Sequence, residues 1–306
     1  ENASSFSPGF SGLLDIDTEI VELPDELSSE TDRQTYARAD VIVGTKYSGK
    51  LPYPAGLKLF HVPGAGYDAV DLDALPASAD VCNCFGHEQA IAEYVMAALL
   101  ARHVPLADAD SRLRRGDWKY WAGAADRVHD ELAGKTIGLL GFGHIGKAIA
   151  ARAKAFEMDV MAYDPYFDEA FAAEHGIKRM ELDDLLRAAN VISLHVPLND
   201  STRHMIDAAR IAEMQDGAIV INTARGGLID EAAAAEAIRS GKLGGLGLDA
   251  FEQEPLVDSP LKNLPHVIFT PHTGAHTGEA VAKMGMMSVE NAIEVLKGEP
   301  CRFILK

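Results

Sequence analysis

Residues 136–150 read Thr-Ile-Gly-Leu-Leu-Gly-Phe-Gly-His-Ile-Gly-Lys-Ala-Ile-Ala, and this stretch decides the fold. The run Thr136–Leu140 predicts a buried strand, and the apolar spacing after His144 predicts a helix. The glycines between them match the pattern G-x-G-x-x-G in the context it requires, a strand before it and a helix after it. The stretch therefore predicts a strand–turn–helix unit that binds a dinucleotide.

Each glycine of the pattern has a predicted role. Gly141 permits a tight turn, Gly143 lets the backbone approach a pyrophosphate, and Gly146 lets the helix pack closely on the strand. The anion is expected at the helix N-terminus, where free N–H groups and the helix dipole favour it. The next predicted strand ends before Asp164, 18 residues after Gly146. A carboxylate there binds a ribose 2′-OH and repels a 2′-phosphate, which predicts NAD rather than NADP. The alternative is an ordinary βαβ turn with Asp164 as a loop residue.

Outward from this stretch, apolar strand runs alternate with helical patterns, which predicts the α/β class with parallel sheets. We expect two domains. A doubly wound parallel-sheet Rossmann domain covers 87–274, and a smaller flavodoxin-like domain covers 1–86 and 275–306. The strands expected in the larger domain are 136–140, 159–163, 191–195, 218–222, 246–249 and 267–270. Those expected in the smaller one are 18–23, 40–43 and 58–62. The expected helices are 88–103, 144–156, 230–240 and 278–298.

Composition excludes several classes of protein. The 306 residues are 47% hydrophobic and 24% charged, as in ordinary globular proteins. The net charge is −18, with 46 acidic against 28 basic residues and no basic cluster, so nucleic acid is not an expected partner. No apolar run reaches the roughly 18 residues of a membrane span, and no signal peptide is visible. The 3 cysteines predict ordinary buried thiols, a cytoplasmic location and no metal site.

Three polar residues follow three of the predicted strands and are expected at one edge of the sheet: Arg225, Glu254 and His272. A guanidinium can grip a carboxylate with two N–H groups. An imidazole can give a proton to a carbonyl oxygen, and a neighbouring carboxylate raises its pKa. Each residue alone is usually structural. Together, in a dinucleotide-binding sheet, they predict the reduction of a 2-oxo acid.

Four further motifs carry a resemblance to a known family. They are Val-Pro-Leu-Asn-Asp-Ser-Thr at 196–202, Asn-Thr-Ala-Arg-Gly-Gly-Leu-Ile-Asp at 222–230, Gly-Leu-Asp-Ala-Phe-Glu at 247–252 followed by Glu254-Pro255, and Pro-His-Thr-Gly at 271–274. With the glycine pattern, they make the chain similar to the D-isomer-specific 2-hydroxyacid dehydrogenases. The resemblance covers nearly the whole chain and is weakest near the N-terminus.

The resemblance implies a role for many of these residues. Catalysis falls to Arg225, Glu254 and His272. The substrate carboxylate is held by Arg225 and by backbone N–H groups at Gly64, Ala65 and Gly66, although a simple turn is the alternative for this loop. Asp249 has a second interpretation, the cap of a strand end, while Asp68 and Asp71 are expected to brace the loop and cap the next segment. The implied cofactor contacts are Gly141, Gly143, His144, Ile145, Gly146, Asp164, His195, Val196, Pro197, Thr202, Thr223, Ala224, Asp249 and Gly274.

The resemblance also bears on partners and substrate. It implies a homodimer joined through the NAD-binding domain by the helix from Glu88, and a small 2-oxo or 2-hydroxy acid such as glyoxylate or hydroxypyruvate as substrate. Glu254 and His87 argue against formate, Ala65 against phosphite and Val62 against phosphoglycerate. An NAD(H)-sensing protein similar to corepressors is the alternative function.

Some features leave the interpretation open. Trp118, Tyr120 and Trp121 either cover a neighbouring site or pack within the chain, and packing is favoured. Lys46 either contacts an acidic tail of the substrate or is a solvated surface residue, the commoner case. The sequence does not indicate the direction of the reaction. Since residue 1 is not Met and the smaller domain has few strands, a first strand upstream of the sequence is a further possibility.

Overall fold

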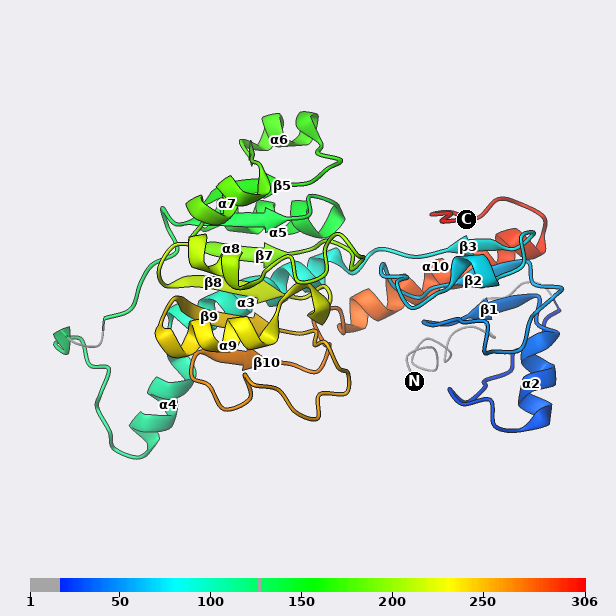
Figure 1. Ribbon diagram of the computed structural model, residues 1–306, viewed down its shortest axis with the longest axis horizontal. Coiled ribbons are helices and arrows are strands. Elements are labelled where there is room, and N and C mark those ends of the chain that lie inside the picture. Colours follow the sequence, from blue (N-terminus) through cyan, green and yellow to red (C-terminus); the bar gives the residue numbers. More distant parts are fainter. Residues whose placement is uncertain (1–16, 126–127) are drawn as a thin grey trace. The chain divides into compact units, whose positions relative to one another are not determined.

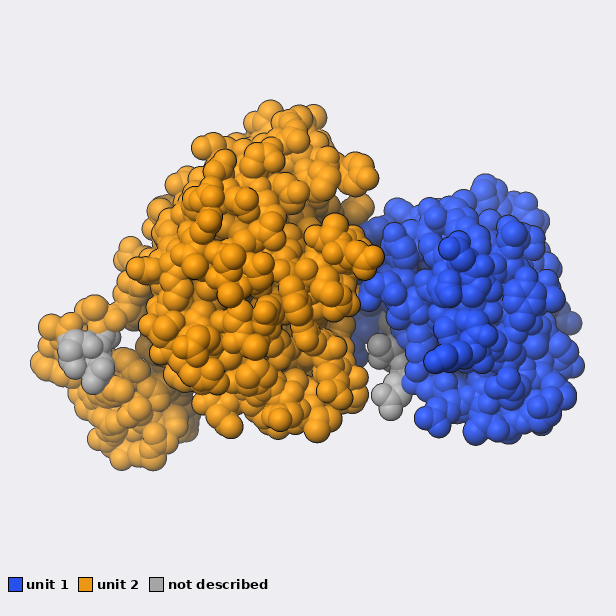
Figure 2. Space-filling view, viewed as in Figure 1, with its two compact units in different colours: residues 1–87, 275–306 blue, residues 88–274 orange. Residues whose placement is uncertain are grey.

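The computed structural model of the protein describes residues 17–125 and 128–306 (Figure 1). The chain divides into two compact units (Figure 2). Unit 1 is 1–87 with 275–306, and unit 2 is 88–274.

Unit 2 contains a parallel sheet in the order β10-β9-β8-β7-β4-β5-β6. The strands are β4 (Thr136–Leu140), β5 (Asp159–Tyr163), β6 (Lys178–Arg179), β7 (Val191–Leu194), β8 (Ala218–Asn222), β9 (Leu243–Leu248) and β10 (Val267–Phe269). The chain builds outward from β4 to β6 and then returns to the other side of β4 with β7. The strand order therefore reverses between β4 and β7, the place where doubly wound sheets bind ligands.

Helices cover this sheet (Figure 1). The helices of unit 2 are α3 (Glu88–His103), α4 (Leu106–Arg114), α5 (His144–Ala155), α6 (Glu169–His175), α7 (Leu182–Ala188), α8 (Ala208–Glu213), η4 (Gly226–Leu228) and α9 (Glu231–Ser240), and all of them except α4 lie near the sheet. All residues of β7 and β8 are buried, as expected for central strands covered on both faces. The side chains of Asp168, Asp207 and Asp230 cap α6, α8 and α9.

Among the described residues, no single helix is long and apolar enough to cross a membrane. The bent pair α3 and α4, with 53° between its helices, passes the same test by length and composition only.

Helix α4 and the segment after it extend away from the sheet of unit 2 (Figure 1). Trp118 is 67% and Trp121 is 58% exposed, so the favoured prediction that they pack within the chain is wrong. Neither tryptophan belongs to the buried hydrophobic residues of the described chain. Tyr120 instead donates a hydrogen bond to Asp108, over 2.7 Å.

Unit 1 is built on three parallel strands in the order β1 (Val41–Val43), β2 (Leu59–His61) and β3 (Asp80–Cys82). The remaining elements are α2 (Glu30–Ala37), η2 (Leu72–Ala74) and α10 (Gly278–Leu296). Residues near the C-terminus pair with β3 in the antiparallel sense, with Leu305 N donating to Val81 O over 2.7 Å. Tyr47, Phe60 and Val81 lie in its core. The predicted cap by Asp71 is confirmed, since its side chain accepts from Ala74 N.

Several predicted elements differ from the structure. No strand forms at 18–23, where nearly every residue is exposed, because a strand also needs a neighbouring strand to pair with. Strands β3 and β6 were missing from the prediction because they are three and two residues long. The predicted helix at 88–103 is confirmed at both ends, and the others differ by one or two residues.

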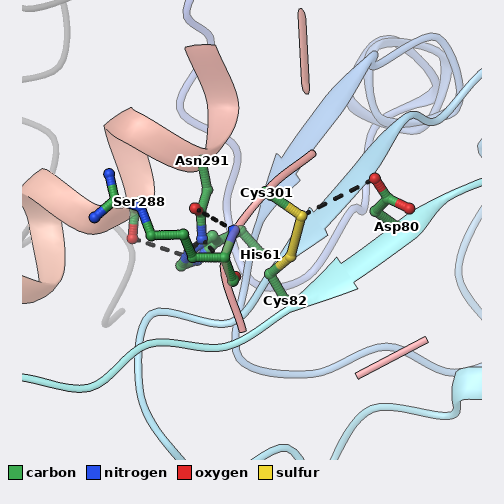
Figure 3. Close-up of a disulfide and its surroundings, with 7 residues drawn as sticks. His61, Asp80, Cys82, Ser288, Asn291 and Cys301 are labelled. Atoms are coloured by element: carbon green, nitrogen blue, oxygen red, sulfur yellow. Dashed lines mark hydrogen bonds between the residues drawn. A yellow bond between two sulfur atoms is a disulfide. The ribbon is translucent and has the colours of Figure 1, made fainter. Parts of the chain in front are cut away.

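The prediction that all cysteines are thiols is wrong for two of them. Cys82 of β3 forms a disulfide with Cys301, and only Cys84 is free among the described residues (Figure 3). The two cysteines are 219 residues apart in sequence, so only the pairing of the C-terminal segment with β3 brings them together.

A buried polar cluster lies beside this disulfide (Figure 3). Asn291 Nδ2 donates to His61 Nε2 over 3.1 Å, and Arg302 N donates to Asn291 Oδ1 over 3.0 Å. Burial lowers the pKa of His61 to about 4, so the ring is neutral and can accept this hydrogen bond. The cluster links β2, α10 and the C-terminal segment.

The disulfide predicts a specific thiol count. Protein purified without reductant and then unfolded should react with a thiol reagent at one cysteine, Cys84, and at three after reduction. The variant Cys84→Ser should show no reactive thiol before reduction. Three thiols in the unreduced wild-type protein would contradict the pairing.

Candidate active site

One edge of the sheet, where neighbouring parallel strands end, carries Arg225, Glu254 and His272. Arg225 is three residues beyond β8, Glu254 lies in the loop after β9, and His272 is three residues beyond β10. Strands β8, β9 and β10 are adjacent in the sheet. The predicted convergence of these residues on one edge thus follows from the strand order.

His272 and Glu254 form a hydrogen-bonded pair. The distance from His272 Nδ1 to Glu254 Oε2 is 3.0 Å, and Glu254 Oε1 accepts from Phe251 N over 3.0 Å. His272 is about half exposed and adopts a positive φ of 54°. Since Nδ1 carries the proton that Glu254 accepts, Nε2 is the atom left for exchange with a substrate.

The pair shifts the titration of both groups. The hydrogen bond to Glu254 and the charge of its carboxylate raise the pKa of His272, although burial opposes the shift. Burial raises the pKa of Glu254, but hydrogen bonds from His272 and Phe251 outweigh it, and the net pKa is lowered. Glu254 therefore stabilises the imidazolium, the form of His272 that can donate a proton.

Arg225 stands on a turn fixed by Asn222, the last residue of β8. Asn222 Nδ2 donates to Arg225 O over 2.8 Å, and Asn222 Oδ1 accepts from Ala224 N over 3.0 Å. The positive charge of Arg225 adds to the lowering of the Glu254 pKa and opposes the rise of the His272 pKa, so its guanidinium acts within the same site. The next residue must be glycine, because a Cβ on Gly226 would lie 1.8 Å from Phe251 C.

Asp249 braces the loop that carries His272. Its side chain is 2% exposed and accepts from Thr270 Oγ1 over 2.6 Å, from Thr273 N over 2.8 Å and from Gly274 N over 2.7 Å. Since the Thr270 hydroxyl donates to Asp249, Tyr94 Oη on α3 donates to Thr270 over 2.5 Å. These contacts favour the second interpretation of Asp249, a cap at a strand end. Sequence reasoning missed Tyr94 and Thr270, whose partners are remote in the chain.

The glycine turn has the shape that a pyrophosphate requires. Gly141 has a φ of +101°, and a Cβ there would lie 2.4 Å from His195 O. A Cβ on Gly146 would lie 2.3 Å from Gly141 O, so the helix packs closely on the turn. The space next to Gly143 is open, and this residue is the N-cap of α5, with no side-chain cap hydrogen bond. The positive end of the helix dipole therefore lies next to the open position at Gly143.

Asp164 is held by the glycine turn itself. Its Oδ2 accepts from Phe142 N and its Oδ1 from Tyr166 N, both over 2.7 Å. The sequence did not predict these bonds, because a loop carboxylate gives no sign of its backbone partners. They fix the carboxylate beside the turn, and each oxygen retains a second lone pair for a ribose hydroxyl.

Other predicted cofactor contacts lie near the ends of β7 and β8. Thr223 Oγ1 is buried and has no hydrogen-bond partner among the described residues, as expected for a group that awaits a ligand. Burial lowers the pKa of His195 to about 3, so this ring is neutral, and its Nε2 lies 2.8 Å from Ser193 Oγ. Thr202 Oγ1 donates to Pro197 O over 2.7 Å. The open turn and the unpartnered Thr223 hydroxyl fit a bound NAD.

The predicted carboxylate loop belongs to unit 1. Its carbonyls are engaged, since Ala65 O accepts from Asn83 Nδ2 over 2.8 Å and Gly64 O accepts from Cys84 N over 3.1 Å. Within the described residues, no group accepts a hydrogen bond from the amides of Gly64, Ala65 or Gly66. This pattern leaves those N–H groups available to an anion, as the prediction requires.

Comparison with known proteins places the chain in a family. The family described as "D-isomer specific 2-hydroxyacid dehydrogenase, NAD binding domain" matches residues 96–274. The chain belongs to the D-isomer specific 2-hydroxyacid dehydrogenases. The matched residues all lie within unit 2, and the predicted recognition, Rossmann fold and cofactor are confirmed.

Curated relatives in this family carry more than one name. The chain is 43% identical over 245 residues to a D-3-phosphoglycerate dehydrogenase of Mycobacterium leprae, covering 79% of this chain and 46% of the relative. It is 42% identical over 245 residues to a hydroxypyruvate reductase of Thermotoga maritima, covering 78% of each. The chain spans about half the length of the phosphoglycerate dehydrogenases that it matches.

A solved structure resembles the chain as well. The glyoxylate reductase of Paecilomyes thermophila is 30% identical with a TM-score of 0.79, over 90% of this chain and 87% of that one.

The pair His272–Glu254 predicts a pH profile. Reduction needs protonated His272, so kcat/KM should fall as the pH rises through a pKa above the ordinary 6.5. The variant Glu254→Gln removes the charge that raises this pKa. In this variant the fall in kcat/KM should begin at lower pH, and kcat should be reduced up to about 100-fold. Steady-state rates of NADH oxidation between pH 5 and 10 measure both effects.

The exposed Asp258 in the same loop provides a matched control. Asp258→Asn should leave the profile unchanged. If the alkaline fall in kcat/KM had the same midpoint in the wild-type protein and in Glu254→Gln, the result would contradict the proposal that Glu254 raises the pKa of His272.

Proposed function

We propose that the protein is an NAD-dependent dehydrogenase that reduces a small 2-oxo acid to a D-2-hydroxy acid. One observation carries the proposal. The histidine of a His272–Glu254 pair, with Nε2 left for exchange, stands at the sheet edge that also bears Arg225, within a unit that belongs to an NAD-binding family. These are the groups that a carbonyl reduction needs besides a hydride donor.

The side chains divide the work of the reaction. NADH, when bound, supplies the hydride. Arg225 holds the substrate carboxylate with two N–H groups and polarises the neighbouring carbonyl. Protonated His272 gives the Nε2 proton to the carbonyl oxygen, and Glu254 stabilises the charge of the imidazolium before the transfer. The amides of Gly64, Ala65 and Gly66 are proposed as further donors to the carboxylate, and the cofactor contacts named above are part of the same proposal.

Hydroxypyruvate and glyoxylate are the proposed substrates. Val62, directly before the carboxylate loop, is 1% exposed and apolar, so it offers no charge to a substrate phosphate. Lys46 is occupied by a surface ion pair with Asp25 at 3.8 Å. Relatives named for hydroxypyruvate and glyoxylate reduction support this choice. The relatives reported above are named as enzymes, and they lend no support to an NAD(H)-sensing role.

We also propose a homodimer joined through unit 2. Helix α4 and the segment after it expose large apolar side chains that a second copy of the chain would cover: Leu106, Leu113, Trp118, Trp121 and Val128. The cysteines no longer support a cytoplasmic location, because Cys82 and Cys301 are joined. That location stays part of the proposal and is measured by cell fractionation.

Turnover tests the proposed function directly. Absorbance at the NADH band should fall with hydroxypyruvate, glyoxylate or another acid from a panel with pyruvate, phenylpyruvate, 2-oxoglutarate and oxaloacetate. His272→Ala and Arg225→Ala should each lower kcat/KM by roughly 10²–10⁴-fold, while NADH still binds in a fluorescence titration. The surface variant Arg239→Ala should match the wild-type protein. Equal turnover in all variants would exclude the mechanism.

The assembly is a separate prediction. Light scattering should give twice the mass of one chain at micromolar concentration. Charged substitutions at Trp118 and Leu113 together should shift the protein toward the monomer with its NADH affinity retained. A wild-type monomer would overturn the proposed interface.

A further inference from the structure

A carboxylate outside the proposed catalytic set holds the loop that carries Glu254. Glu231 is the first residue of α9. Its Oε2 accepts from Ser259 Oγ over 2.7 Å, and its Oε1 accepts from Glu252 N over 3.3 Å. These two donors lie on either side of Glu254, two residues before it and five residues after it. A single side chain therefore ties together both ends of the loop.

The surroundings of the loop make this tie rigid. Ser259 is 8% exposed, and its Oγ also accepts from Leu261 N over 3.3 Å. On the other side, the backbone of Phe251 and Glu252 packs against Gly226 with no room for a Cβ. Glu252 Oε1 also accepts a hydrogen bond from His204 Nε2, and the backbone N of His204 donates to Gly227 O over 2.8 Å. The loop is thus fixed against the turn that bears Arg225 and against the start of α9.

We propose that Glu231 is a positioning residue that sets the distance between Glu254 and His272. The inference rests on the proposed function, because it assigns Glu231 a task in placing the proton donor. The hydrogen bonds of Glu231 within the described residues go to Glu252 N and Ser259 Oγ, so it acts through the loop. A side chain that only stabilised the helix would serve α9 through its dipole, and Asp230 already caps that helix over 3.0 Å.

The mechanism of this effect is geometric. Glu254 raises the pKa of His272 through a hydrogen bond of 3.0 Å, and that effect falls steeply as the two groups separate. Without the hydrogen bonds to Glu231, the segment between Glu252 and Ser259 can shift, and Glu254 can move away from His272. The proton donor then loses both its orientation and its raised pKa, whereas the glycine turn that faces the cofactor is untouched.

Glu231→Gln tests the inference, because an amide cannot accept a hydrogen bond at both ends. We expect kcat to fall roughly 10- to 100-fold, the order that a displacement of about 1 Å produces. The alkaline fall of the kcat/KM profile should move to lower pH, toward that of Glu254→Gln, and NADH affinity should not change. Glu236→Gln, on the exposed side of the same helix, should behave like the wild-type protein.

A second pair of variants guards against misfolding of the first. Ser259→Ala removes one donor to Glu231 and should shift the pH profile of kcat/KM to lower pH as well. Ser259→Thr keeps the hydroxyl and should retain the wild-type profile. A lower melting temperature with an unchanged pH profile in Glu231→Gln and Ser259→Ala would overturn the inference and leave a purely structural role.

One measurement separates this inference from the proposed function. The pKa of His272 can be followed by NMR titration of its ring protons, which requires no turnover. Absence of turnover in the wild-type protein with every acid of the panel would refute the proposed function. The NMR titration would still test the role of Glu231. A lower His272 pKa in Glu231→Gln supports the positioning role, and an unchanged pKa overturns it.

Discussion

A carboxylate buried at the end of β9 is the interaction on which the site depends. Asp249 sits in the interior and accepts hydrogen bonds from Thr270, Thr273 and Gly274, so the chain on both sides of His272 is anchored to the neighbouring strand. A buried acidic group is costly unless its oxygens are satisfied, and here the backbone and a threonine satisfy them. The positive φ of His272 persists because its flanks are fixed in this way.

The remaining parts of the site repeat this arrangement at other strand ends. Asn222 fixes the turn of Arg225, Glu231 ties the loop of Glu254, and Asp164 holds the glycine turn. In each case a polar side chain accepts a hydrogen bond from a backbone N–H group of the loop or turn. The exposed reactive groups therefore stand on loops whose backbones are bonded to the rigid sheet.

Much of the fold and site could be predicted from the sequence. Long apolar runs and the helix at 88–103 were predictable because local periodicity specifies them, and the motifs located Arg225, Glu254 and His272 because each follows a strand. Pairing between remote segments was not predictable. The disulfide of Cys82 and Cys301, the exposed tryptophans and the absence of a strand at 18–23 all depend on which segments meet. The partners of Asp249 and Glu231 were hidden for the same reason.

The proposed acid–base set and the nucleotide turn all lie within 88–274, whereas the loop proposed to hold the carboxylate lies within 1–87. Acid–base chemistry and nucleotide binding would therefore be inherited together in one contiguous stretch of the gene. Exchange of the flanking segments between relatives could alter which acid is accepted and leave the proton donor with its partners. Such modular exchange offers a physical account of how relatives in one family come to carry names for different hydroxy acids.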